Sequence, residues 1–152
     1  MTSAGLLMFR RKAGVLEVLL VHPGGPFFAG KDEGVWTIPK GEVAPGEDLI
    51  MRARKEFEEE LGIQATGDLF SLGSIKQKGG KTVHAWAFEG DLPDSFELKS
   101  NTFEMEWPPR SGKLVEFPEI DRAMFLSAKE ARQKINSAQV EFLDRLVEML
   151  NQ

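Results

Sequence analysis

The chain of 152 residues has no cysteine and only two histidines. The lack of cysteine excludes disulfides and thiolate zinc sites, and two histidines are too few for a histidine-rich metal centre. Any bound metal must therefore be held by oxygen ligands. No run approaches the roughly 18 apolar residues that span a membrane, and the apolar start of the chain is too short for a secretory signal. We therefore expect a cytoplasmic protein without a membrane partner.

The chain also has fewer basic than acidic residues, 19 against 24, which gives a formal net charge of -5. An acidic balance argues against a nucleic-acid polymer as the main partner. Its length and its 41% hydrophobic content suit one domain with one core, which we expect to span 1–152. The sequence gives no indication of the oligomeric state.

The spacing of the apolar residues predicts strands before and after a central helix in the chain, followed by two terminal helices. A loop rich in glycine and proline is expected over 23–34. Glycine at position 62 is a suitable C-terminal cap for the central helix. We expect an α+β layered domain, with strands over 3–10, 15–22, 35–38, 69–77 and 82–89 and helices over 48–61, 127–135 and 140–150.

The central helix carries an unusual density of acidic residues. At about 100° per residue, Glu56, Glu59 and Glu60 share one flank, opposite the apolar stripe. Like charges at this spacing repel each other, so we expect a positive group to compensate them. A magnesium ion suits carboxylate ligands, and it can neutralise a diphosphate and activate water for attack on phosphorus. The flank predicts pyrophosphate hydrolysis, and a solvated helix face is the alternative.

The segment from position 41 to position 63 has a specific spacing: a glycine, five residues, a glutamate, seven residues, and then KEFEEELGI. This pattern resembles the Nudix box. Lys55 stands where the family has arginine. The other fixed positions all match: Gly41, Glu47, Glu56, Phe57, Glu59, Glu60, Gly62 and Ile63.

The resemblance implies the Nudix fold, a mixed β-sheet sandwiched between α-helices. It also implies Mg²⁺, or Mn²⁺ in its place, bound by Glu56, Glu59 and Glu60. Gly41 and Glu47 would complete this metal site, with Glu47 supporting the water network around the metal.

Lys55 takes the position of an arginine that, in the family, orients a neighbouring glutamate. Lysine keeps the charge but loses the planar bidentate fork. We expect Lys55 to reach Glu59 one turn further along the helix. Arg54 lies about 100° around the helix and is a poor substitute. Glu58 occupies a variable position and is expected at the surface.

Two flanking motifs narrow the choice within the family. Trp36-Thr-Ile-Pro-Lys40-Gly resembles a motif of members that hydrolyse diadenosine or diphosphoinositol polyphosphates, which implies that Lys40 faces phosphate. The alternative is that Trp36 and Ile38 are core and Lys40 is solvated. Downstream, the segment from Glu119 to Leu126 is similar to a loop and strand of diadenosine polyphosphate hydrolases.

Several further residues follow as candidates. The similarity implies that Glu119 is a further metal ligand or the general base, and the alternative is that it lies in a surface loop. Glu59 is the other candidate base, and Glu116 is the neighbouring rival of Glu119. The chain has no tyrosine to stack on a nucleobase. Trp107 offers a π surface instead, with Arg110 and Lys113 to meet phosphates, or it packs a long loop.

The sequence therefore predicts a Mg²⁺-dependent hydrolase of a phosphoanhydride bond in a small nucleoside diphosphate derivative, with a diadenosine polyphosphate favoured. The alternatives are a nucleoside triphosphate pyrophosphohydrolase and a Nudix-fold module that binds a nucleotide with weak turnover.

Overall fold

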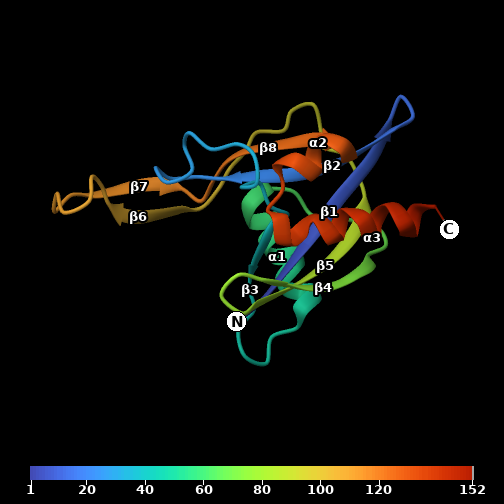
Figure 1. The fold of residues 1–152 in the computed structure, drawn as a ribbon, viewed down its shortest axis with the longest axis horizontal. Coiled ribbons are helices and arrows are strands. Elements are labelled where there is room, and N and C mark those ends of the chain that lie inside the picture. The colour runs from blue at the N-terminus through green and yellow to red at the C-terminus, as the bar shows by residue number, and fades with distance from the viewer. Residues whose placement is uncertain (152) are drawn as a thin grey trace.

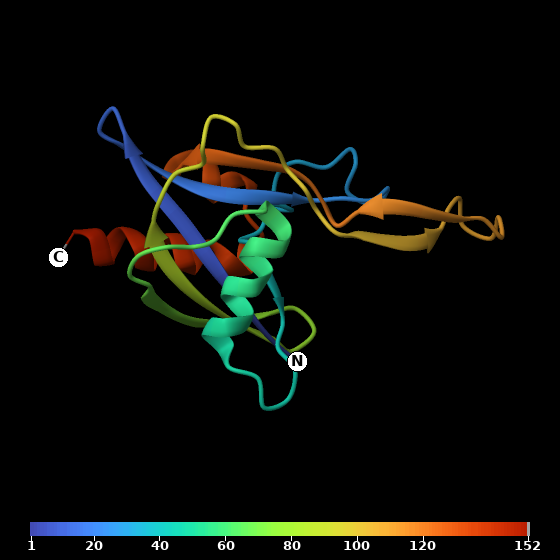
Figure 2. The ribbon, with the colours of Figure 1, turned by 180° about the vertical axis from the view of Figure 1, so that it is seen from behind.

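The computed structural model describes residues 1–151, which form three layers. A six-stranded sheet separates helix α1 on one face from helices α2 and α3 on the other (Figures 1 and 2). The expected sandwich is therefore confirmed. The strands of the sheet are β1 (Thr2–Lys12), β2 (Val15–Pro23), β3 (Lys40–Glu42), β4 (Phe70–Gln77), β5 (Lys81–Glu89) and β8 (Ile120–Ser127). The helices are α1 (Leu49–Leu61), α2 (Ala128–Lys134) and α3 (Val140–Leu150), with a 3₁₀ turn over Ser137–Gln139.

The sheet is mixed because its central strand β1 runs parallel to β5 and antiparallel to β2. The order is β4-β5-β1-β2-β8, and the short strand β3 also pairs with β1. Since β5 occupies one edge of β1, β2 and β3 share the other edge. β2 takes its C-terminal part, and β3 takes the part near Ser3 and Ala4. This arrangement brings the start of the acidic segment next to the beginning of the chain.

Alternation along β1 supplies both faces of the sheet with core residues. Leu6 and Met8 belong to the apolar cluster that includes Phe57 of α1, whereas Leu7 and Phe9 belong to the cluster on the side of α3. Each fully buried side chain of this size contributes about 1.5–3 kcal/mol. The core therefore fixes α1 with its acidic flank at the rim of the layer.

Both ends of α1 are capped, and the cap at its C-terminal end is the glycine that the sequence indicates. The carboxylate of Asp48 accepts a hydrogen bond from the amide of Met51 at 3.4 Å. At the other end Gly62 has φ 72°, and its N–H donates to the carbonyl of Glu58 at 2.7 Å. Glycine adopts this left-handed conformation without a Cβ clash. The predicted helix and its cap are confirmed.

The segment 35–38 was predicted as a strand, and the structure corrects this. Its backbone changes partner at each step: Trp36 bonds to the carbonyl of Lys134, and Thr37 exchanges two bonds with Val21. Only isolated bridges result, and Trp36 and Ile38 are fully buried. The segment crosses between layers instead of extending a ladder, and β3 begins only at Lys40.

A two-stranded ribbon of β6 (Thr102–Glu106) and β7 (Leu114–Pro118) is the main element that the apolar pattern did not reveal. It projects from the layered body (Figures 1 and 2). The other predicted strands and helices are present near their expected bounds. Within the described 151 residues, none of the helices has the length and apolar content needed to cross a membrane.

Phe57→Ala should destabilise the fold by about 3–5 kcal/mol, since the ring is fully buried and meets Phe88 edge-on at 5.2 Å. Met51 lies on the same helix but is 67% exposed, so Met51→Ala should cost under about 0.5 kcal/mol. Urea unfolding of the two variants checks this difference. Equal losses would show that α1 is not anchored through Phe57.

Candidate active site

Four carboxylates gather between α1 and the start of β8. Glu56, Glu59 and Glu60 line one flank of the helix, and Glu119 lies in the connection between β7 and β8. Burial, followed by the charges of Glu56 and Glu119, raises the pKa of Glu60 to about 9. Burial also raises the pKa of Glu56, with contributions from Glu59 and Glu119. The structure therefore brings Glu119 to the helix flank, 60 positions in the chain away from Glu59.

Glu119 is held by its backbone on both sides. Its N–H donates to the carbonyl of Asn101 at 2.8 Å, and its carbonyl accepts from Gly24 at 2.9 Å. Its side chain is exposed. Its neighbour Glu116 lies on β7 instead, opposite Glu104 of β6 in the antiparallel backbone pairing of the projecting ribbon. Of the two candidates in this segment, Glu119 is the one whose charge acts on the carboxylates of α1.

Glu60 is the most unusual group of the site. Its side chain is 8% exposed, and Oε2 is buried without a hydrogen-bond partner among the described residues. A buried carboxylate oxygen in this state is costly unless a cation or a donor satisfies it. The donor set is all oxygen, which suits Mg²⁺. Across 1–151, however, three acidic or histidine side chains nowhere converge tightly enough to enclose an ion.

Gly41 is required by the packing of Glu56. A Cβ at position 41 would overlap Cγ, Cδ and Oε1 of the Glu56 side chain. Gly41 lies on β3 and pairs with Ala4 of β1, so its backbone cannot easily retreat. The structure thus gives Gly41 the role of leaving room for a carboxylate.

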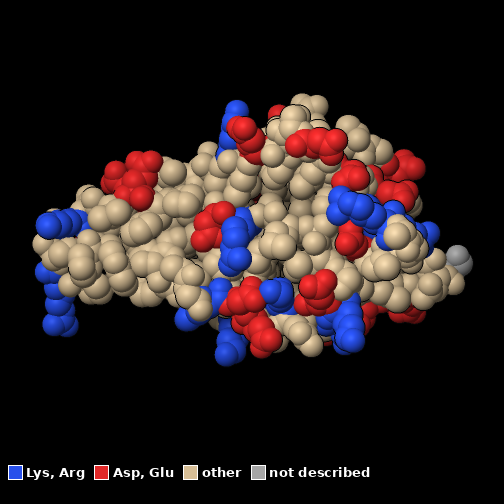
Figure 3. Space-filling view, turned by 90° about the horizontal axis from the view of Figure 1, so that it is seen from above, with Lys and Arg blue, Asp and Glu red and all other residues tan. Residues whose placement is uncertain are grey.

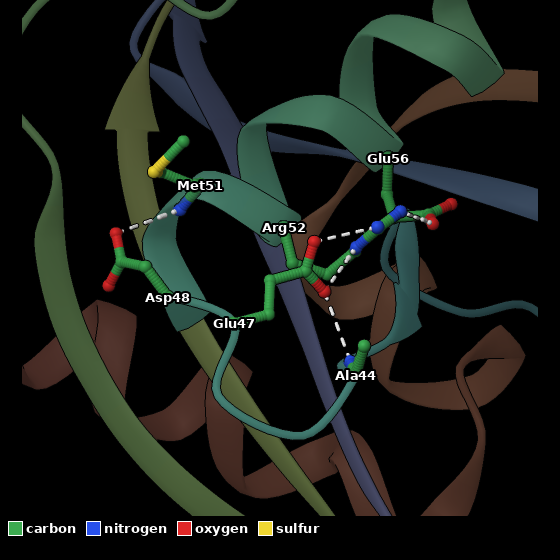
Figure 4. Close-up of polar contacts among 6 residues, drawn as sticks. All are labelled: Ala44, Glu47, Asp48, Met51, Arg52 and Glu56. Carbon is green, nitrogen blue, oxygen red and sulfur yellow. Dashed lines mark hydrogen bonds and ion pairs between the residues drawn. The ribbon is translucent and has the colours of Figure 1, made fainter.

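Arg52 is a site residue that the sequence reasoning missed. Its Nε and Nη2 donate to the two carboxylate oxygens of Glu47 at 2.9 and 2.7 Å, and Nη1 donates to Oε1 of Glu56 at 2.9 Å (Figure 4). The backbone N–H of Ala44 also donates to Glu47 at 3.0 Å. The hydrogen bonds from Arg52, then that from Ala44, lower the pKa of Glu47. The spacing of Arg52 and Glu56, one helical turn, was the available signal.

Lys55 is exposed at the position of the family arginine. No ion pair joins it to Glu59 in the part of the chain that the structure describes, contrary to our expectation. Its charge instead adds to the lowering of the pKa of Glu47, after the larger effects of Arg52 and Ala44. Glu58 is exposed, as expected.

Lys40 is a second basic residue whose charge acts on this cluster, after Arg52, which contacts Glu56 directly. It is half-buried at the start of β3, and burial, followed by the charge of Lys81, lowers its pKa. The charges of Glu60 and Glu56 act in the opposite direction. The alternative prediction placed Trp36 and Ile38 in the core and Lys40 in solvent. Trp36 and Ile38 are indeed fully buried, but Lys40 is half-buried.

A cavity of about 190 Å³ opens beside Lys40. Its lining combines an aromatic ring with amide side chains and includes Phe28, Gln77, Asn136 and Gln139. Gln139 is fully buried, accepts from the N–H of Ile38 at 3.1 Å and donates to Gln77 at 3.2 Å. These bonds fix the segment that leads into Lys40.

Trp107, Arg110 and Lys113 belong to the turn that joins β6 to β7. The ribbon of these two strands projects away from α1 (Figure 2), so the fold does not bring the turn to the carboxylates of the helix. Trp107 packs edge-on against Phe27 with ring centroids 5.8 Å apart. Arg110 and Lys113 are exposed. On the face shown in Figure 3, basic and acidic side chains are interspersed over the body of the molecule. That face offers no continuous basic track for a nucleic-acid backbone.

The chain is similar to known proteins in sequence and in fold. A family model described as NUDIX domain matches residues 1–146. An asymmetrical bis(5'-nucleosyl)-tetraphosphatase of Caenorhabditis elegans is 33% identical over 111 residues, covering 69% of this chain and 76% of that protein. The tetraphosphatase of Rattus norvegicus is 33% identical over 101 residues, covering 57% of this chain and 63% of that protein. The crystal structure of a C. elegans Ap4A hydrolase binary complex is similar in fold, with TM-score 0.69 and 24% identity over 98% of both chains.

The raised pKa of Glu60 predicts a pH-dependent stability in the presence of EDTA. Between the ordinary value of 4.5 and about 9, the folded protein keeps a proton that the unfolded chain has released. The free energy of unfolding should therefore fall as pH rises through this window. Relative to Glu60→Gln, the wild type should lose about 2–5 kcal/mol in urea unfolding between about pH 5 and about pH 9.

Glu58→Gln is the matched control, because Glu58 carries the same group on the exposed side of α1. This variant should keep the pH dependence of the wild type. If the free energy of unfolding changed with pH in the same way for wild type and Glu60→Gln, Glu60 would ionise in the folded protein as it does in water.

Proposed function

The chain belongs to the Nudix family and is a Nudix pyrophosphohydrolase, and on this premise we propose that it is a Mg²⁺-dependent hydrolase of dinucleoside polyphosphates. The observation that carries the proposal is the buried oxygen of Glu60, which has no hydrogen-bond partner in the described part of the chain and lies within reach of the charges of Glu56, Glu119 and Lys40. Such a cluster is stable in its charged form only with a cation.

Glu56, Glu59 and Glu60 would hold the Mg²⁺, since all three lie on one flank of α1. Glu47 supports this set through Arg52, which it shares with Glu56. The bound cation would supply charge neutralisation at the diphosphate and a lowered pKa of water. Mn²⁺ would serve in its place, since it also accepts oxygen ligands.

The reaction cleaves one phosphoanhydride bond. A water oxygen forms a bond to phosphorus, the bridging P–O bond breaks, and the departing phosphate keeps the electron pair. The proton of the water passes to a carboxylate, for which Glu59 and Glu119 are the candidates. Glu119 is suited to this role because its backbone is fixed while its side chain faces solvent.

Lys40 would bind a phosphate of the substrate. Its half-buried ammonium adjoins both the carboxylates and the cavity lined by Phe28 and Gln77. A polyphosphate passing Lys40 would place a nucleoside in that cavity, where Phe28 offers an aromatic surface and the amides offer hydrogen bonds. Phe28 would thus serve in place of a tyrosine.

A dinucleoside polyphosphate is favoured over a nucleoside triphosphate on two grounds. The sequence before the box, from Trp36 to Lys40, resembles that of members that hydrolyse diadenosine or diphosphoinositol polyphosphates, and neither kind of substrate is a simple nucleoside triphosphate. The relatives from C. elegans and R. norvegicus carry the name bis(5'-nucleosyl)-tetraphosphatase. Trp107, Arg110 and Lys113 would take part only if the second nucleoside extends toward the ribbon, so we assign the phosphate contact to Lys40.

The proposed activity is tested by product release from a panel of diadenosine polyphosphates, nucleoside triphosphates, ADP-ribose and diphosphoinositol polyphosphates, with Mg²⁺ or with EDTA. The dinucleoside substrates should be cleaved fastest, and EDTA should stop the reaction. Glu59→Gln should lower kcat by at least about 100-fold, because it removes a charged ligand or the base while keeping the shape of the side chain.

Glu58→Gln is the matched variant for this test, since it removes the same charge from the exposed side of the helix. It should retain the wild-type kcat. Faster cleavage of nucleoside triphosphates would favour the triphosphate alternative. Nucleotide binding without turnover on any substrate would favour a binding module and overturn the proposal.

Lys40→Met should raise KM for the best substrate by about 10–100-fold, because a charge-assisted hydrogen bond to phosphate contributes about 1.5–3 kcal/mol. Lys129, which is exposed on α2, provides the control Lys129→Met. Steady-state kinetics separate the two variants. An unchanged KM in Lys40→Met would remove Lys40 from the substrate site.

A further inference from the structure

The bidentate contact between Arg52 and Glu47 stands out on the surface of α1. Two N–H groups of one guanidinium face the two oxygens of one carboxylate, and the third nitrogen reaches Glu56. All three side chains are at most one quarter exposed: 17% for Arg52, 25% for Glu47 and 16% for Glu56. Planar fork geometry of this kind fixes orientation in a way that a point charge does not.

Lys55 cannot provide such a fork. The side chain of lysine has one nitrogen, and Lys55 forms no ion pair among residues 1–151. Arg52 lies three positions earlier, on nearly the same side of the helix. Both cations act on Glu47, with Arg52 in direct contact and Lys55 at longer range.

We propose that Arg52 is the positioning residue of this active site and takes over, from one turn earlier on α1, the orienting of glutamates that the family assigns to the arginine at position 55. It holds Glu47 and Glu56 as one unit on the flank of α1 where the cation would bind. The role rests on the proposed function. It also explains why lysine is sufficient at position 55, since only a charge is needed there.

The surroundings of Glu56 and Glu47 reinforce this hold. The backbone of Gly41 bounds Glu56 on the side away from α1, so the carboxylate is confined between a glycine and a guanidinium. Glu47 is bound by Arg52 and by the N–H of Ala44. Removing the fork would therefore free two carboxylates while leaving the helix and the core unchanged.

The test compares Arg52→Lys with Arg54→Lys. Both keep the charge and change only the shape of the donor, but Arg54 contacts the carbonyl of Ala65 at the exposed side of α1. Arg52→Lys should lower kcat by about 10–100-fold with KM nearly unchanged, which is the usual effect of losing a residue that orients metal ligands. It should also weaken Mn²⁺ binding, followed by electron paramagnetic resonance without substrate, by about tenfold. Arg54→Lys should match the wild type in both.

A rescue experiment separates positioning from a merely structural salt bridge. The double variant Arg52→Lys/Lys55→Arg puts the fork at the family position, near enough for the charge at 55 to act on Glu47. It should recover most of the kcat and the Mn²⁺ affinity lost in Arg52→Lys. A structural salt bridge would instead lower thermal stability without a change in kcat or Mn²⁺ affinity.

The proposal is overturned if Arg52→Lys leaves both kcat and Mn²⁺ binding at wild-type values. It is also overturned if Lys55→Met lowers them more than Arg52→Lys does. Failure of the proposed function gives a different result, because wild type then turns over no substrate of the panel. The Mn²⁺ measurement still reports on Arg52 in that case.

Discussion

The burial of a carboxylate at the end of α1 is the constraint on which the site depends. Glu60 lies at the edge of the core with one oxygen that has no hydrogen-bond partner within residues 1–151, and the charges of Glu56 and Glu119 disfavour its ionised form. The fold tolerates this arrangement because Phe57 and the apolar stripe of α1 are fully buried on the opposite side. Core packing of α1 thus holds Glu56, Glu59 and Glu60 on one flank, where electrostatic repulsion alone would separate them.

The sheet contributes the second wall of the site. Because β3 pairs with the N-terminal part of β1, Gly41 comes directly under Glu56, and Lys40 comes to the opening of the neighbouring cavity. The connection before β8 adds Glu119 from the other end of the chain. Arg52 then ties Glu47 to Glu56 across the first turns of α1. The proposed recognition and chemistry would therefore depend on elements that are distant in sequence.

Local patterns predicted most of the fold. The helix from Leu49 to Leu61 and its glycine cap follow from periodicity and from the conformational freedom of glycine. The segment 35–38 was misjudged because burial there comes from crossing between layers, which no local period encodes. The β6–β7 ribbon was missed because each strand has only five residues and β7 does not alternate strictly, since Leu114 and Val115 are both apolar. For the site, the box spacing predicted which glutamates would bind a metal, and this stays a prediction. The partner of Glu47 depended on side-chain reach, which distinguishes Arg52 from Lys55 only in three dimensions.

Proton release on metal binding tests the central claim most directly. At about pH 7.5 Glu60 is protonated in the metal-free protein, because its pKa is about 9, and a cation must displace that proton. Calorimetric titration with Mn²⁺ in buffers of different ionisation enthalpy should therefore show release of about one proton per ion bound. Saturable binding with no proton release, or no saturable binding, would contradict a cation site built around Glu60.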